Sequence, residues 1–286
     1  MQSIRPAAVA GMFYPGTPAV LGAAVRAYLA EARPPAEPVA SPPKALIVPH
    51  AGYVYSGPVA APAYRRLAAG RGTICRVVLL GPVHRVPIRG LALPSTQAFA
   101  TPLGTVAVDT DAAARALEMR QVQVSEAAHA LEHSLEVQLP FLQTVLDEFR
   151  IVPFAVGDAT AEEVAAVIET LWGGPETLIV VSSDLSHYHP YAAARQIDRG
   201  TAAAILALDS SLDHEQACGA TPINGLALCA RRRNLKPELI DLRNSGDTAG
   251  DKSRVVGYAA FAFAERGSGS SRKEAVEALV EPADAG

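Results

Sequence analysis

The hydrophobic residues of this chain fall into two alternating patterns. Short runs rich in Val, Ile and Leu have the length and branched character of strands buried on both faces. These runs are Ala45–Val48, Val77–Leu80, Ile151–Val156 and Thr177–Val181. Segments with apolar residues at helical spacing lie before or between them and after the last run: Pro18–Ala32, Ala112–Met119, Glu162–Leu171 and Tyr191–Leu208. Strands that alternate with helices predict one α/β domain, with a mixed or mostly parallel sheet and helices on both faces.

Weaker patterns complete the predicted domain, which covers residues 1–265. Further strands are expected at Leu91–Leu93, Thr105–Val108, Glu238–Leu242 and Val255–Ala264, and a further helix over Glu126–Phe141. The first 17 residues, with two prolines and two glycines, predict an irregular arm whose aromatic pair, Phe13 and Tyr14, packs on the domain. The Gly/Ser-rich residues 266–286 predict a flexible linker and tail.

Two of the predicted strands are followed by a proline and then a histidine. His50 follows Ala45–Val48 in the segment VPHAGYVYSG, and His84 follows Val77–Leu80 in LLGPVHR. Open α/β sheets bind ligands at the carboxyl ends of their strands. Two imidazoles from neighbouring strand ends can therefore meet at one ion, and imidazole suits Zn, Cu, Fe and Ni. The repeated pattern favours a metal site over two unrelated loop histidines that hydrogen-bond only to the backbone.

The segment ALEHSLEVQLPF places a third histidine among carboxylates. On the predicted helix, His133 and Glu136 share one face, and Glu132 lies beside them. A solvated polar face would carry the same residue types. The functional alternative is an acid/base or metal-supporting histidine that is oriented by Glu132 or Glu136.

The densest polar cluster, SSDLSHYHP, follows the strand Thr177–Val181. Serine and aspartate are also common in structural turns, so Ser182–Asp184 fit either a turn or a site. His187 is less readily explained as a turn residue. The functional hypothesis is a carboxylate, Asp184, and a base, His187, in the same crevice as His50 and His84.

Cys218 precedes a glycine at the start of a predicted helix that runs to Arg231. The positive end of a helix dipole lowers the pKa of a nearby thiol, so we expect a thiolate that can react or bind metal. The chain has three cysteines at unrelated spacings, which imply no disulfide framework.

The composition is that of a compact globular protein, with 49% hydrophobic and 19% charged residues. A formal net charge of −4 gives no basic footprint for nucleic acid. No run approaches the roughly 20 apolar residues that span a bilayer, and the N-terminus lacks the apolar core of a signal peptide. We therefore expect a cytoplasmic protein that binds neither nucleic acid nor membrane.

Seven motifs, in order, resemble those of the Memo family, whose bacterial and archaeal members are often called AmmeMemoRadiSam system protein B. They lie between about Arg5 and Phe263: VAGMFYP, VPHAGYVYSG, LLGPVHR, EHSLEVQLPF, VSSDLSHY, ACGATPI, and NSGD followed by VVGYAAFAF. The Memo family in turn resembles the catalytic subunits of class III extradiol dioxygenases, which hold a non-haem Fe(II) ion with two histidines and a glutamate.

The resemblance implies a metal site of two histidines and one cysteine, which would be His50, His84 and Cys218. It also implies that His187 is the base-like residue, with Asp184 nearby, and that His133 is a further site histidine. A thiolate in place of a carboxylate shifts the preference toward softer ions such as Cu(I) or Zn and keeps Fe(II) possible. We expect one mononuclear ion, Fe(II) or Cu, with Zn as the third candidate. The implied activity is that of a dioxygenase-like oxidoreductase, although the ligand change argues against catechol cleavage itself.

Two other functions stay open at this point. One is a non-catalytic metal-containing binding or regulatory module, which would bind an unknown small molecule or peptide and act with radical-SAM-associated protein partners. The other is metal-independent hydrolysis by Ser182 or Ser183 with His187. The GxSxG motif that often surrounds a nucleophilic serine is absent around these serines.

Overall fold

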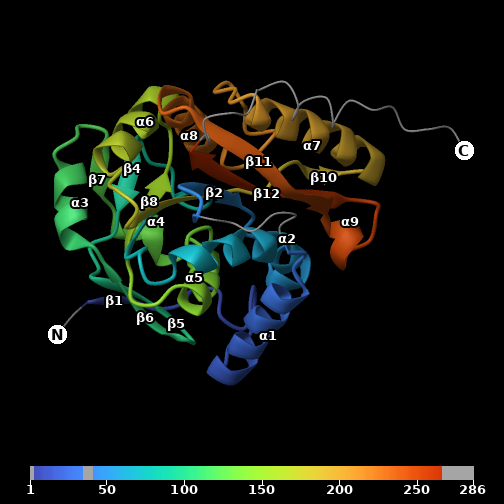
Figure 1. The fold of residues 1–286 in the computed structure, drawn as a ribbon, viewed down its shortest axis with the longest axis horizontal. Helices are drawn as coiled ribbons and strands as arrows, with labels where there is room; N and C mark the ends of the chain where they lie inside the picture. Colours follow the sequence, from blue (N-terminus) through green and yellow to red (C-terminus); the bar gives the residue numbers. More distant parts are fainter. Residues whose placement is uncertain (1–2, 35–40, 266–286) are drawn as a thin grey trace, which may run out of the picture.

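A computed structural model describes residues 3–34 and 41–265 of the chain (Figure 1). Its centre is a set of five parallel strands. In sheet order they are β6 (Gly104–Val108), β8 (Arg150–Val156), β3 (Arg76–Pro82), β9 (Thr177–Ser182) and β2 (Ala45–Val48). Because parallel strands all end at the same edge of a sheet, whatever follows each of them in the sequence gathers along one line.

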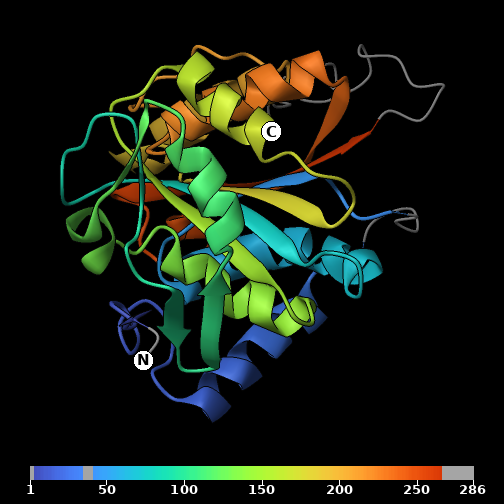
Figure 2. The same ribbon diagram turned by 90° about the vertical axis from the view of Figure 1, so that its left-hand side faces the viewer.

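Shorter or antiparallel strands extend this centre on both sides. Next to β2 lies β12 (Val255–Glu265), which also pairs with β11 (Leu235–Asn244) and β10 (His187–His189). On the other side, β5 (Ala98–Thr101) forms a hairpin with β6 (Figure 2), and β1 (Ile4–Arg5) runs beside β5. The remaining two strands, β4 (Leu91–Leu93) and β7 (Val122–Val124), pair with each other, and β4 also pairs with β8. The described residues thus contain one mixed sheet of twelve strands.

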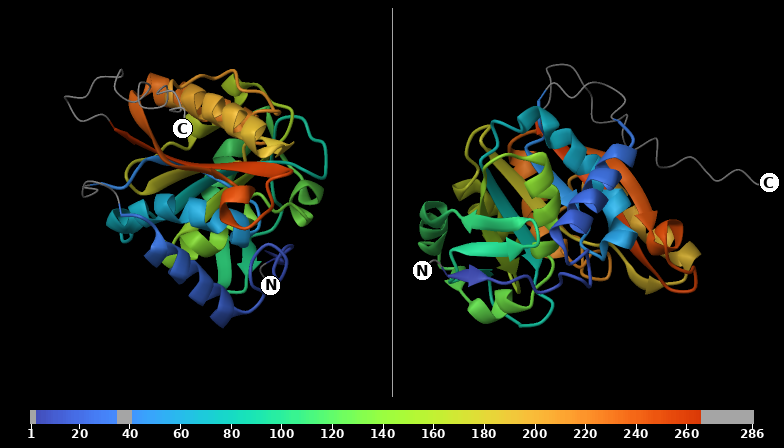
Figure 3. Two further views of the ribbon diagram at one scale, coloured as in Figure 1. Left: turned by 90° about the vertical axis from the view of Figure 1, so that its right-hand side faces the viewer. Right: turned by 90° about the horizontal axis from the view of Figure 1, so that it is seen from below.

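Helices cover both faces of the sheet (Figures 1 and 3). One face carries α1 (Pro18–Glu31), α2 (Tyr53–Arg65) and α5 (Leu139–Val145), and the other carries α3 (Thr110–Leu117), α6 (Ala161–Thr170), α7 (Tyr191–Leu206) and α8 (Ala220–Arg232). Short helices occur at Arg66–Gly70 (η1), Glu126–Ala130 (α4), Glu136–Gln138 (η2) and Ser245–Thr248 (α9). In β2, Leu46 and Val48 enter one core while Ala45 and Ile47 enter the other, which is why this strand has no polar position. The predicted fold class is confirmed.

The largest difference from the predicted elements concerns residues 126–141, which do not form one helix. Helix α4 ends at Ala130, and the chain turns before η2 and α5. Pro140 lies in the first turn of α5, where its missing N–H is tolerated, whereas in the middle of a longer helix it would break a hydrogen bond. The backbone N–H groups of His133 and Ser134 bind the carboxylate of Glu132 instead of helix carbonyls. His133 and Glu136 therefore do not share a helical face.

Two other expectations concern the C-terminal tail and the membrane. The linker and tail predicted for residues 266–286 lie outside the described residues. Across the described ranges, no helix is both long enough and apolar enough to cross a membrane.

A buried arginine fixes the N-terminal arm to the segment that contains His133. Arg5 is 1% exposed, and its guanidinium donates to the carbonyl oxygens of His129 (2.6 Å) and Glu132 (2.5 Å) and to the carboxylate of Glu136 (2.6 Å). Glu136 also accepts hydrogen bonds from the Tyr14 hydroxyl and from two backbone N–H groups of the arm. As predicted, the arm packs on the domain, and here a fully desolvated ion pair holds it.

Replacement of Arg5 by methionine is expected to lower the free energy of unfolding by about 3 to 5 kcal/mol, because Glu136 would stay buried without its cation. Arg71→Met is the matched control. The Arg71–Asp147 pair is more than half exposed on both sides, so its loss should cost about 1 kcal/mol or less. Urea unfolding of both variants measures the difference. Equal losses in the two variants would contradict this role of Arg5.

Candidate metal centre

The two histidines that follow proline lie at the same edge of the sheet. His50 comes two residues after β2 ends, and His84 comes two residues after β3 ends. Their strands are not neighbours, contrary to the prediction, because β9 lies between β2 and β3. The side chain of Ser182, the last residue of β9, is therefore within 2.9 Å of the His50 ring, at its Nδ1 atom.

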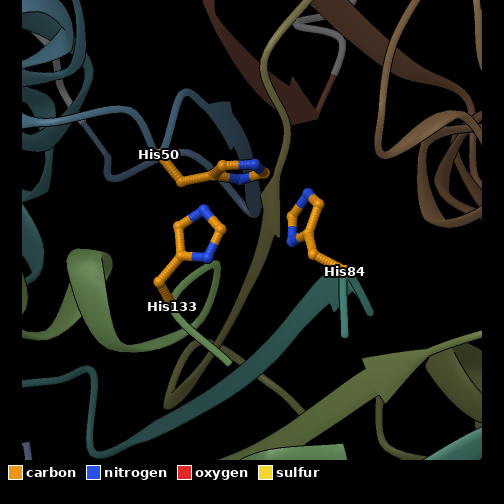
Figure 4. A group of neighbouring side chains, drawn as sticks. All are labelled: His50, His84 and His133. Carbon is orange, nitrogen blue, oxygen red and sulfur yellow. The ribbon is translucent and has the colours of Figure 1, made fainter. Parts of the chain in front are cut away.

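His133 joins them, so that three imidazoles point toward one another (Figure 4). Each offers one ring nitrogen within 4.8 Å of the other two. A tetrahedral ion with bonds of about 2.0 Å keeps its ligand nitrogens about 3.3 Å apart, so small ring rotations would close this group around one ion. The His50 side chain is buried, whereas the His84 side chain is 30% exposed, which leaves an open side. The donor set and its spacing fit a single metal ion.

Glu132 orients the His84 ring. One carboxylate oxygen accepts the backbone N–H of His84 (2.7 Å), and the other lies 2.9 Å from its Nδ1 atom. Burial by itself would raise the pKa of Glu132, but the hydrogen bonds from His84 and Ser134 outweigh it and lower this pKa to about 2. An ionised carboxylate only accepts hydrogen bonds, so Nδ1 of His84 carries a proton. Nε2 is then the ring atom that can bind a metal ion. This is the carboxylate–histidine arrangement that typically supports a metal ligand.

The two more deeply placed histidines are held in their neutral form. Burial, followed by the charge of His84, lowers the pKa of His50 to about 3. Burial, followed by the charge of His50, lowers the pKa of His133 to about 4. A neutral imidazole is the form that binds metal ions. These imidazoles therefore need no deprotonation step at neutral pH.

Cys218 contacts His50 but lies outside the group of three histidines. Its sulfur is 3.3 Å from Nε2 of His50 and accepts the backbone N–H of Asp184, also at 3.3 Å. Burial, and next the charge of Asp184, raises the pKa of this thiol to about 12. The predicted lowering by the helix dipole is wrong, because desolvation outweighs it even though the residue is one position before the cap of α8. Such a thiol ionises only beside a strong positive charge, such as a bound cation.

Asp184 and His187 both follow β9, and Asp184 contacts the His50 segment of this centre. One oxygen of Asp184 accepts the backbone N–H of His50 at 2.7 Å, and burial raises the pKa of the carboxyl group. His187 begins β10 and is half buried, and its charge acts on the pKa values of both His50 and Asp184. Asp184 thus positions the His50 backbone.

The two serines after Val181 have structural partners. Ser182 and Ser183 are fully buried, and the Ser183 hydroxyl donates to the carbonyl oxygen of Asp184 and accepts from the Gly219 N–H. Within the described part of the chain, no hydrogen bond joins either hydroxyl to His187. This arrangement does not favour a serine nucleophile.

Sequence reasoning missed two residues of this centre. The Phe13 ring, in the N-terminal arm, lies 4.7 Å from the His133 ring, measured between centroids. Gln138, in η2, donates a hydrogen bond to the Ser182 hydroxyl. Neither residue type signals a site by itself, and both lie far from the strand ends in the sequence. Only their motifs, VAGMFYP and EHSLEVQLPF, marked the segments that contain them.

The fold and the cluster together define an α/β protein with a candidate mononuclear metal centre at the carboxyl edge of its sheet. A family model described as "Memo-like protein" matches residues 5–262, and the chain belongs to this family.

Curated relatives agree with this assignment. A MEMO1 family protein of Archaeoglobus fulgidus is 38% identical over 275 residues, which cover 91% of this chain and 99% of the relative. Those of Aquifex aeolicus and Sulfolobus acidocaldarius are 36% and 34% identical, covering 91% and 92% of this chain and 99% and 100% of the relatives. Among solved structures, an uncharacterized protein, JW3007, from Escherichia coli K12 matches 76% of this chain and 98% of its own with a TM-score of 0.51. At 13% identity this last match supports the fold alone.

A fourth histidine of this region, His129, has a different environment. It is 1% exposed, and its Nε2 lies 2.8 Å from the carbonyl oxygen of Ala92. Burial, which is only partly offset by this hydrogen bond, lowers its pKa to about 4. Because the folded protein holds His129 neutral, the unfolded chain binds more protons between about pH 6.5 and pH 4, and stability falls as the pH is lowered through this range.

His129→Gln, which keeps a donor for Ala92, should remove part of this pH dependence. Between pH 7 and pH 5 the variant is expected to lose about 2 kcal/mol less unfolding free energy than the wild type. His50 and His133 still contribute to the loss in both proteins. Urea unfolding at the two pH values measures the effect, and parallel pH profiles would contradict it.

Proposed function

We propose that this protein binds one metal ion through His50, His84 and Cys218 and is a dioxygenase-like, metal-dependent oxidoreductase. The contact between the Cys218 sulfur and Nε2 of His50 carries the proposal. Sulfur and nitrogen ligands of one tetrahedral ion, at about 2.3 and 2.0 Å from it, lie about 3.5 Å from each other. The observed separation is 3.3 Å, so both atoms can bind one ion without a change in the backbone.

Fe(II) and Cu are the first candidates for the ion and Zn is the third. The thiolate favours softer ions such as Cu(I) or Zn, and the two imidazoles suit Fe as well. When bound, iron or copper would supply redox and oxygen-binding chemistry. The chain itself would hold and move protons. His187 would act as general acid/base, and His133, whose ring lies 4.7 Å from the rings of Phe13 and His84 between centroids, would act as a pocket donor or second base.

The three-histidine group supports a competing arrangement, in which His133 instead of Cys218 is the third ligand. His50 and His84 are common to both. Replacement of Cys218 would release the ion in the first arrangement, and replacement of His133 would release it in the second. The metal content of these two variants therefore distinguishes the two arrangements.

Elemental analysis of anaerobically purified protein should find near-stoichiometric metal in the wild type and in His133→Gln. His50→Ala, His84→Ala and Cys218→Ser should each retain less than about a tenth of it, since each removes a direct ligand. His129→Gln is the control for the loss of any histidine, because the ring of His129 contacts the Ala92 carbonyl oxygen. Loss of metal from His133→Gln but not from Cys218→Ser would replace our proposal by the three-histidine site.

Exposure of the iron-loaded protein to oxygen tests the oxidoreductase assignment. We expect the visible spectrum of the wild type to change within minutes of exposure, because three protein ligands leave positions open at the ion. A non-catalytic binding module, acting with radical-SAM-associated partners, would bind its ligand equally well without metal. An unchanged spectrum together with metal-independent ligand binding would favour that module and contradict our proposal.

A further inference from the structure

The proton positions around Ser182 determine which ring nitrogen of His50 is free. The Ser182 hydroxyl is fully buried and has three polar neighbours. It lies 2.6 Å from the carbonyl oxygen of Ser134, 2.7 Å from the side-chain nitrogen of Gln138 and 2.9 Å from Nδ1 of His50. A hydroxyl has one proton to donate and two lone pairs that accept, so three neighbours use its full capacity.

The Ser182 hydroxyl donates its proton in a hydrogen bond to the carbonyl oxygen of Ser134. That oxygen can only accept a hydrogen bond, and at 2.6 Å the Ser182 hydroxyl must donate to it. If the hydroxyl turned toward His50 instead, two buried lone pairs would face each other at that distance. An unsatisfied buried acceptor costs about 1 to 3 kcal/mol.

One of the two Ser182 lone pairs accepts a hydrogen bond from the Gln138 side-chain amide. The amide nitrogen donates to the Pro49 carbonyl oxygen (3.0 Å) as well as to Ser182, while the amide oxygen accepts from the Tyr64 hydroxyl at 2.8 Å. With the amide turned over, the Gln138 oxygen would face the Pro49 oxygen with no hydrogen between them. The orientation of the amide is therefore fixed from both ends, and Gln138 is 0% exposed.

The second lone pair of the Ser182 oxygen is left, and only a proton on Nδ1 of His50 can donate a hydrogen bond to it. We infer that Ser182 is a positioning residue that selects the Nδ1–H tautomer of His50, leaving Nε2 bare beside Cys218. His84 has the same Nδ1–H tautomer because its Nδ1 faces the Glu132 carboxylate, which can only accept a hydrogen bond. A serine hydroxyl can either donate to an imidazole nitrogen or accept from it. At Ser182 the hydrogen bonds with Ser134 and Gln138 leave only the acceptor role toward His50. This inference rests on the proposed function only where it treats Nε2 as the ligand atom.

The tautomer can be measured without any metal. In metal-free wild type labelled with ¹⁵N-histidine, two-bond proton–nitrogen NMR correlations distinguish Nδ1–H from Nε2–H rings. His50 is identified by the signal that disappears in His50→Gln. We expect His50 as Nδ1–H at pH 7.5, and an Nε2–H ring in the wild type would overturn the inference.

Two substitutions then test the consequence for binding. Ser182→Ala removes the acceptor, so His50 should give a mixture of tautomers, and Zn²⁺ affinity, measured by competition with a chromophoric chelator, should fall about 10- to 100-fold. Ser182→Thr keeps the hydroxyl and should restore the Nδ1–H ring and an affinity within about threefold of the wild type. Wild-type affinity in Ser182→Ala would overturn the inference, as would failure of Ser182→Thr to restore the tautomer in a folded protein.

The two proposals fail in different ways. If the wild type binds no Zn²⁺, Fe(II) or Cu, the proposed function is wrong, while the tautomer measurement still decides the role of Ser182. If Ser182→Ala does not fold, the wild-type spectrum and Ser182→Thr still decide it.

Discussion

The parallel register of β2, β9 and β3 is the constraint on which the candidate centre depends. Val48 pairs with Ser182, and Leu80 pairs with Val181, so the three strands end within one residue of one another. His50 and His84 follow the outer two strands and Ser182 ends the middle one. The sheet thereby brings two imidazoles and the hydroxyl between them to one edge. A shift of one residue in this register would turn Ser182 to the opposite face.

His133 is held differently, by side chains instead of by a strand. Its segment turns around the Glu132 carboxylate, which accepts hydrogen bonds from His84, His133 and Ser134. Arg5 binds the Glu132 carbonyl oxygen from the other side. The geometry of this histidine therefore depends on charged groups that are stable in the core only while they are paired. Burial also keeps the imidazoles of His50 and His133 neutral and the Cys218 thiol protonated, so these three groups carry no charge in the metal-free protein.

Much of the fold followed from the sequence, because buried strands and amphipathic helices have distinct periods. Strand Ala45–Val48 was predicted to the residue, and the helices expected around Ala112–Met119 and Glu162–Leu171 are present as α3 and α6. The helix predicted over 126–141 is wrong because the Glu132 carboxylate binds the backbone N–H groups of His133 and Ser134, and because Pro140 would break a hydrogen bond inside a longer helix. Short strands such as Ala98–Thr101 and His187–His189 were missed, since three or four residues carry too little periodicity to be recognised.

The site was predictable in part for similar reasons. His50, His84 and Asp184 follow strand ends, which local patterns locate. The contact of Cys218 with His50 was expected only from the family resemblance, and the raised pKa of its thiol was not, because burial depends on the packing of distant segments. The hydrogen bonds of Gln138 with Ser182 likewise join elements 44 residues apart in the sequence.

X-ray absorption spectroscopy of the anaerobically purified protein tests the central claim most directly, because it reports the atoms bound to the metal. One sulfur at about 2.3 Å and two imidazole nitrogens at about 2.0 Å are expected, from Cys218, His50 and His84. A first shell of nitrogen and oxygen without sulfur, or a protein without metal, would contradict the proposed centre.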